Sequence, residues 1–197
     1  MLIAERFNDS LFHAGRRTFL NRSGLVLSGT AIALLGGCHS VAAQVQKTGA
    51  KDTQATDIQI LDSALAAERQ GIAAYQLGAD SGLLQKPVRD LALQFQGHHK
   101  AHADLLAATI KQLGGSPADP PKKYDFPVEK LKTQADVLQF AAGLEQGAVS
   151  AYLAAIPILD NRDLAKAAGS ILGDEAMHWA ILRQALGENP VPAAFVG

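Results

Sequence analysis

The chain carries six side chains whose types and spacing suit the binding of metal ions: Glu68, His99, His102, Glu145, Glu175 and His178. Residues three apart on a helix lie on the same face, so His99 with His102 can reach one ion, as can Glu175 with His178. Carboxylate and imidazole donors together favour iron or manganese, and zinc also accepts them. The pattern predicts a centre for one or two ions, with iron as the leading metal.

The six candidate ligands are expected to face the protein interior. In a helix of about 3.6 residues per turn, Glu68 falls on the same stripe as Leu61 and Leu65, and the other five fall beside apolar residues of their own segments. Buried carboxylates without partners cost several kcal/mol, and no Lys or Arg shares these faces. A divalent cation would supply the missing charge. The alternative is a bundle without metal, in which these polar groups hydrogen-bond to one another.

The candidate ligands belong to an internal repeat. Two sets of segments correspond: Glu68–Tyr75 with Glu145–Tyr152, and Gly97–His102 with Gly173–His178. Tyr75 and Tyr152 are candidate hydrogen-bond donors to the ligands or redox-active phenols, with core packing as the alternative. His98 is expected at the edge of the apolar stripe rather than among the ligands.

Four helices must position these residues. Apolar spacing and end signals predict helices over residues 56–78, 87–113, 133–156 and 161–187. Thr56, Thr133 and Asn161 are expected as N-caps, and Pro87 suits a first helical turn. The Pro-rich stretch 115–132 cannot be continuous helix and is long enough to cross the bundle. We therefore predict an all-α fold, a four-helix bundle built from two tandem helical hairpins joined by a long crossover.

This arrangement resembles the ferritin-like superfamily, which includes the rubrerythrins and bacterioferritins. The resemblance covers residues 56–187 and rests on Glu68, Glu145 and the motif Glu175-x-x-His178. It implies a di-iron centre with one Glu from each of two helices and Glu-x-x-His from each of the other two. His99 departs from the pattern, which has a metal-bridging glutamate at this place. The options are two ions bridged mainly by Glu175, a mixed iron and manganese pair, or a single ion.

The resemblance also implies a function. The leading hypothesis is an enzyme that activates oxygen or peroxide, or oxidises ferrous iron, so that its partner is a small-molecule substrate or a metal ion. The alternative is a non-catalytic metal-binding or structural lipoprotein that serves stress survival. An iron-storage cage is disfavoured because a lipid tether would hinder a closed shell. A homodimer is the oligomer that we consider.

The N-terminal segment, residues 1–37, has the features of an export signal. Gly15–Leu20 contains paired arginines and precedes Gly24–Gly37, a weakly apolar stretch, and together they resemble a twin-arginine signal. Leu35–Cys38 looks like a lipobox, which implies a lipid on Cys38. Because Cys38 is the only cysteine, an internal disulfide is excluded.

Two further expectations concern processing and location. Cleavage after Ala43 would instead release a soluble periplasmic protein without the lipid. Residues 38–55 are expected to form a flexible tether, and residues 188–197 a C-terminal tail. Either route leads to the periplasmic side of the cell envelope, and His39 next to the lipidated cysteine favours the outer membrane.

Composition limits the remaining options. A chain of 197 residues with 48% hydrophobic and 19% charged residues suits one well-cored domain with an appended segment. The formal net charge of -1 gives no electrostatic case for nucleic acid, which we exclude as a partner.

Overall fold

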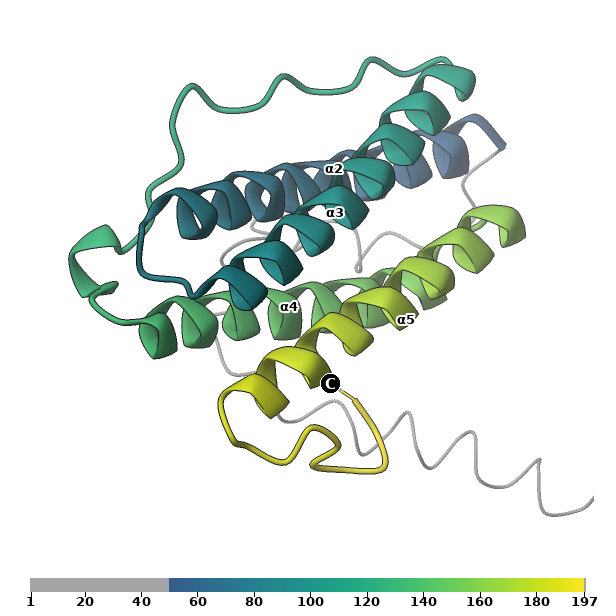
Figure 1. The fold of residues 1–197 in the computed structure, drawn as a ribbon. Helices are drawn as coiled ribbons and strands as arrows, with labels where there is room; N and C mark the ends of the chain where they lie inside the picture. Colours follow the sequence, from purple (N-terminus) through teal and green to yellow (C-terminus); the bar gives the residue numbers. More distant parts are fainter. Residues whose placement is uncertain (1–49, 197) are drawn as a thin grey trace, which may run out of the picture. The chain divides into compact units, whose positions relative to one another are not determined.

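A computed structural model describes residues 50–196, which form a bundle of four long helices (Figure 1). The helices are α2 (Ala50–Asp80), α3 (Lys86–Gln112), α4 (Gln134–Ala155) and α5 (Arg162–Ala185), with short 3-10 turns η4 (Val128–Lys130) and η5 (Ile156–Ile158). No strand occurs in this part of the chain, so the predicted all-α four-helix bundle is confirmed. None of these helices is both long and apolar enough to cross a membrane. The predicted export signal and Cys38 lie outside the described residues, as does most of the predicted tether.

The four helices form two hairpins. α2 packs mainly against α3, α4 packs mainly against α5, and α2 also contacts α4. A long connection without α-helix leads from the end of α3 along the bundle to the start of α4, so α3 and α4 run in the same direction (Figure 1). This connection is held against α2, because the Ala118 N–H donates to Asp62 at 2.9 Å and the Arg69 guanidinium donates to the Ala118 carbonyl.

Three of the four helices begin where the sequence predicted. Thr133 caps α4 in a capping box with Asp136, Asn161 caps α5, and proline stands in the first turn of α3. The first helix differs, because α2 begins at Ala50 and Thr56 lies inside it rather than at its N-cap. Residues 50–55 contain neither Gly nor Pro, so nothing in them ends the helix, and they are helical instead of part of a tether.

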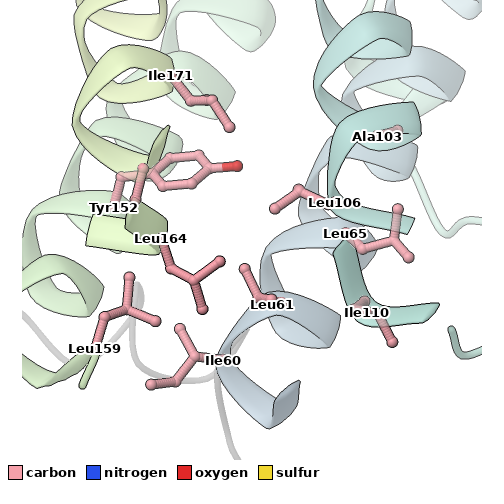
Figure 2. Close-up of a cluster of buried hydrophobic side chains, with 11 residues drawn as sticks. Ile60, Leu61, Leu65, Ala103, Leu106, Ile110, Tyr152, Leu159, Leu164 and Ile171 are labelled. Carbon is pink, nitrogen blue, oxygen red and sulfur yellow. The ribbon is translucent and has the colours of Figure 1, made fainter. Parts of the chain in front are cut away.

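Two apolar clusters fill the bundle on either side of its middle. The first contains Ile60, Leu61, Leu65, Leu106, Ile110, Leu159 and Leu164 among its members, and Figure 2 shows it between the hairpins. The second contains Tyr75, Phe95, Leu138, Ala142 and Leu182. On every helix the predicted ligands stand in the sequence between members of the two clusters. The clusters therefore close both ends of the region where the polar residues meet.

Candidate metal centre

All six predicted ligands come together midway along the bundle. Their donor atoms form two overlapping groups: Glu68, His99, His102 and Glu175, and His99, Glu145, Glu175 and His178. The donor atoms within each group all lie within 4.8 Å of one another. Glu175 and His99 belong to both groups, so they occupy the middle of the centre.

The three carboxylates of the centre are buried and have only histidines as ion-pair partners within residues 50–196. Glu68 is 2% exposed, Glu145 is 1% exposed and Glu175 is 0% exposed. The short distances include 3.0 Å from His102 Nδ1 to Glu175 Oε1 and 3.5 Å from His178 Nδ1 to Glu145 Oε1. The positive charge that balances these groups must therefore come from protonated imidazole or from a bound cation.

Unpaired polar atoms test whether this set of residues fits a metal ion. In the described part of the chain, six buried side-chain nitrogen or oxygen atoms lack a hydrogen-bond partner, and five of them belong to this centre. They are Glu145 Oε2, both Glu175 carboxylate oxygens, His102 Nδ1 and His178 Nδ1. The two nitrogens lie within ion-pair distance of carboxylates but form no hydrogen bond with them. Leaving such atoms unpaired costs about 1–3 kcal/mol each, whereas a divalent cation would bind their lone pairs. The donor set fits iron, manganese or zinc.

The two predicted tyrosines link the hairpins through the terminal carboxylates. The Tyr152 hydroxyl donates to Glu68 Oε1 at 2.6 Å, and the Tyr75 hydroxyl donates to Glu145 Oε1. Burial, together with the charge of Glu145, raises the pKa of Tyr75 well above its usual range. Burial and the neighbouring Glu68 raise the pKa of Tyr152 in the same way. Both phenols therefore stay protonated and hold one oxygen of each carboxylate.

His99 lies between the carboxylates of the two hairpins. Its Nδ1 is 2.8 Å from Glu68 Oε2, and its Nε2 is 3.3 Å from Glu145 Oε1. Burial favours the neutral ring, but hydrogen bonds to Glu145 and Glu68 raise the pKa of His99 to about 11. Without a metal, His99 is thus an imidazolium that donates to both carboxylates.

Gly71 makes room for the ring of His99, which is a feature that sequence analysis missed. A Cβ atom at Gly71 would stand 3.1 Å from both Cε1 and Nδ1 of His99. In the repeat, Gly71 corresponds to Ala148, three residues after Glu145. The first half of the repeat, which has His99, therefore carries glycine at this position, and the second half, which has Glu175 in place of His99, carries alanine. The simultaneous change of both residues between the two halves of the repeat could have predicted this contact from the sequence.

His98 and Asp174 lie at the rim of the centre, outside both buried groups; the 38% exposure of the His98 side chain agrees with its expected place at the edge of the stripe, whereas Asp174 was not considered. His98 Nδ1 is 2.8 Å from His178 Nε2. Asp174 Oδ2 is 3.4 Å from His102 Nε2 and 3.4 Å from His178 Nε2. It thus faces the ring nitrogens that point away from the centre, where a carboxylate fixes the ring orientation. The signal was the repeat, in which His98 and Asp174 occupy corresponding positions.

The fold and the cluster together define a helical bundle with a buried carboxylate and histidine centre. The sequence profile of the ferritin-like domain matches residues 56–188. The chain therefore belongs to the ferritin-like domain family.

Solved structures of low sequence identity share the fold. A conserved hypothetical protein of Mycobacterium tuberculosis has a TM-score of 0.63 at 23% identity, over 73% of this chain and 99% of that one. A ferritin-like diiron-carboxylate protein of Bacillus anthracis has a TM-score of 0.60 at 21% identity, over 68% and 97%. The bacterioferritin of Desulfovibrio desulfuricans, which was solved with its diiron site, has a TM-score of 0.66 at 18% identity, over 72% of this chain and 84% of that one. A search of curated proteins found no match.

Proposed function

We propose that this protein binds iron at the buried centre and reacts there with oxygen, peroxide or ferrous iron as substrate. The five unpaired donor atoms of the centre carry this proposal, because they converge where a cation would satisfy them. Two structural neighbours support iron, since one is described as a diiron-carboxylate protein and another through its diiron site. Manganese and zinc are the alternatives that the donor set also accepts.

The two overlapping groups assign ligands to two positions. Glu68 and His102 would hold an ion on the side of the first hairpin, and Glu145 and His178 on the side of the second. Glu175 would serve both. Iron supplies one-electron redox chemistry when it is bound.

The protein's own residues prepare the centre for that chemistry. Tyr75 and Tyr152 keep Glu145 and Glu68 in place by donating to one oxygen of each. An apolar pocket lined by Tyr75, Phe95 and neighbouring aliphatic residues adjoins the centre. The ring of Phe95 stacks on His178 with 4.0 Å between centroids. A pocket of this kind excludes water and accepts a small apolar molecule such as oxygen.

A non-catalytic metal-binding role is the second candidate, and His99 is the observation that favours it. Its ring fills the space between Glu68 and Glu145 and contacts both. A neutral imidazole offers one lone pair, whereas the bridging glutamate of the family offers a charge and two oxygens. The centre would then hold a single ion. One iron ion supplies one electron, whereas two-electron chemistry is easier with two ions.

Two measurements on the full-length protein test these proposals. Elemental analysis after anaerobic loading with ferrous iron should give between one and two ions per chain, because His99 lies between the two positions, and His99→Glu should raise this number toward two. Oxygen and peroxide consumption by the ferrous protein should exceed that of Glu145→Ala. Iron binding without any such consumption would leave the non-catalytic role. If His99→Glu leaves the stoichiometry unchanged, His99 does not limit the number of ions.

We also propose that the protein lies in the cell envelope and carries a lipid on Cys38. The paired Arg16 and Arg17 and the single cysteine after Gly36 and Gly37 support this location. Fractionation of cells that express the full chain should find it in the membrane and carrying a labelled fatty acid. Cys38→Ala should remove the label, and Arg16→Lys with Arg17→Lys should block export. A labelled protein after Cys38→Ala would contradict the lipid assignment.

A further inference from the structure

A second cluster of metal-binding side chains lies outside the buried centre, between α3 and α5. The outer cluster consists of His98, Asp174 and His178, and their donor atoms lie within 4.8 Å of one another. His98 Nδ1 is 2.8 Å from His178 Nε2 and 3.1 Å from Asp174 Oδ2. Two imidazoles and a carboxylate at this spacing form a set of ligands for a borderline divalent cation such as Zn²⁺, Co²⁺ or Fe²⁺.

The outer cluster connects the surface with the centre. The side chain of His98 is 38% exposed and that of Asp174 is 22% exposed. His102, whose Nε2 lies 3.4 Å from Asp174 Oδ2, is 14% exposed, whereas Glu175 is 0% exposed. Donor atoms of decreasing exposure therefore lead from solvent to the buried carboxylates on this side of the bundle.

His178 belongs to both places through its two ring nitrogens. Its Nδ1 lies 3.7 Å from Glu175 Oε2, and its Nε2 faces His98 and Asp174. A neutral imidazole has a lone pair on one nitrogen at a time. An ion in the outer cluster and an ion in the centre therefore compete for His178, and the outer cluster has all three ligands only when the centre does not use this ring.

We propose that the outer cluster is a divalent-cation site at which ions bind before they pass to the buried centre. Two of its three ligands, His98 and Asp174, are partly exposed, so an ion can bind there before it loses all its water. It then exchanges the outer ligands His98 and Asp174 for the buried carboxylates. The binding site itself is independent of the proposed function, whereas the passage of the ion inward rests on it.

Zinc binding to a protein with a disabled centre tests the outer site. In the full-length protein with Glu68→Gln and Glu145→Gln, equilibrium dialysis should still find about one Zn²⁺ per chain. Adding His98→Ala should weaken this binding about tenfold or more, and adding the control Gln94→Ala, an exposed residue of α3, should not. No zinc in the double variant, or equal affinity after His98→Ala, would overturn the proposal.

Cobalt uptake by the protein with its centre intact tests the passage inward and does not depend on the folding of the double variant. Stopped-flow absorbance should show that His98→Ala slows the loading of Co²⁺ about tenfold, while the final amount bound in the centre stays the same. Equal rates in wild type and variant would refute a path through the outer cluster. A wild-type centre that never binds Co²⁺ would instead count against the proposed function, while zinc in the double variant still decides the outer site.

Discussion

At the scale of single residues, the packing around His99 determines how the ligands of the centre are held. The ring contacts Glu68 and Glu145 and also lies close to Gly71, where a Cβ atom would stand 3.1 Å from it. Hydrogen bonds on both nitrogens prevent the ring from moving aside. A methyl group at Gly71 would therefore strain the centre, although a Gly to Ala change in a helix otherwise adds about 0.5–1 kcal/mol of stability.

We predict that Gly71→Ala lowers the free energy of unfolding by about 1–2 kcal/mol and weakens metal binding. Combined with His99→Glu, the same change should be neutral or stabilising, since the corresponding Ala148 stands in the half of the repeat that has Glu175. Urea unfolding measures both effects. Gly143→Ala is the matched control, because nothing lies within 4 Å of a Cβ atom there. Equal effects at Gly71 and Gly143 would show that His99 can yield.

At the scale of elements, the two hairpins are joined by contacts at the ends of helices. Asp57 of α2 is 4% exposed and accepts from the backbone N–H groups of Asp160 at 3.0 Å and Asn161 at 3.1 Å. Gln54 Nε2 donates to the Leu113 carbonyl at 2.7 Å. Asp57 thus ties the first turns of α2 to the connection between α4 and α5 in the second hairpin, and Gln54 ties them to the end of α3 in the first.

We expect Asp57→Ala to lower the free energy of unfolding by about 2–3 kcal/mol, because two partly buried hydrogen bonds to a charged acceptor are lost. Thermal or urea unfolding provides the measurement. Asp104→Ala, at an exposed position of α3, removes the same charge and should change stability by less than about 0.5 kcal/mol. If the two variants unfold alike, the Asp57 contacts do not hold the hairpins together.

Local patterns predicted most of these elements but not their tertiary contacts. The helices could be predicted because Thr133, Asn161 and the apolar stripes act within a few residues of the chain. The start of α2 could not be predicted, since Thr56 is of a residue type that favours N-caps, whereas Gln54 and Asp57 form hydrogen bonds with residues distant in the sequence. The contacts of the long connection with α2 were likewise hidden from local reasoning.

For the metal centre, too, the sequence predicted some features and not others. The repeat and the helical projection together predicted that six ligand-type residues would converge, and they do. A projection gives the direction of a side chain from its own helix axis but not the distance to the next helix. For that reason Asp174 and the role of Gly71 were missed, and so was the contact between His98 and His178.

At the scale of the whole molecule, metal, protons and stability are linked through the centre. In the protein without metal, burial favours the neutral rings, but the neighbouring carboxylates outweigh it and raise the pKa of His102 and of His178 to about 9 and that of His99 to about 11. Burial would raise the pKa of Glu145, but the neighbouring His178 and His99 hold it well below its usual range. Protonated histidines thus take the place of a cation at neutral pH.

The raised pKa values predict opposite pH trends for folding and metal binding. A group with a raised folded pKa stabilises fully below its unfolded value near 6.5 and loses this contribution as pH rises through the folded value. The Tm of the metal-free protein should therefore fall between about pH 7 and pH 10, while metal affinity rises because fewer protons are displaced. Calorimetry in buffers of different ionisation enthalpy should detect proton release on binding. A Tm independent of pH in this range would contradict the protonated centre.

The convergence of six donors on one buried point is tested most directly by metal stoichiometry with and without Glu175, which both groups share. The full-length protein is loaded anaerobically with ferrous iron, separated from free metal and subjected to elemental analysis. We predict about one bound ion per chain or more in wild type and almost none after Glu175→Gln, with the helix content unchanged by circular dichroism. A wild-type protein that retains no metal, or a Glu175→Gln variant that retains as much as wild type, would contradict the metal centre.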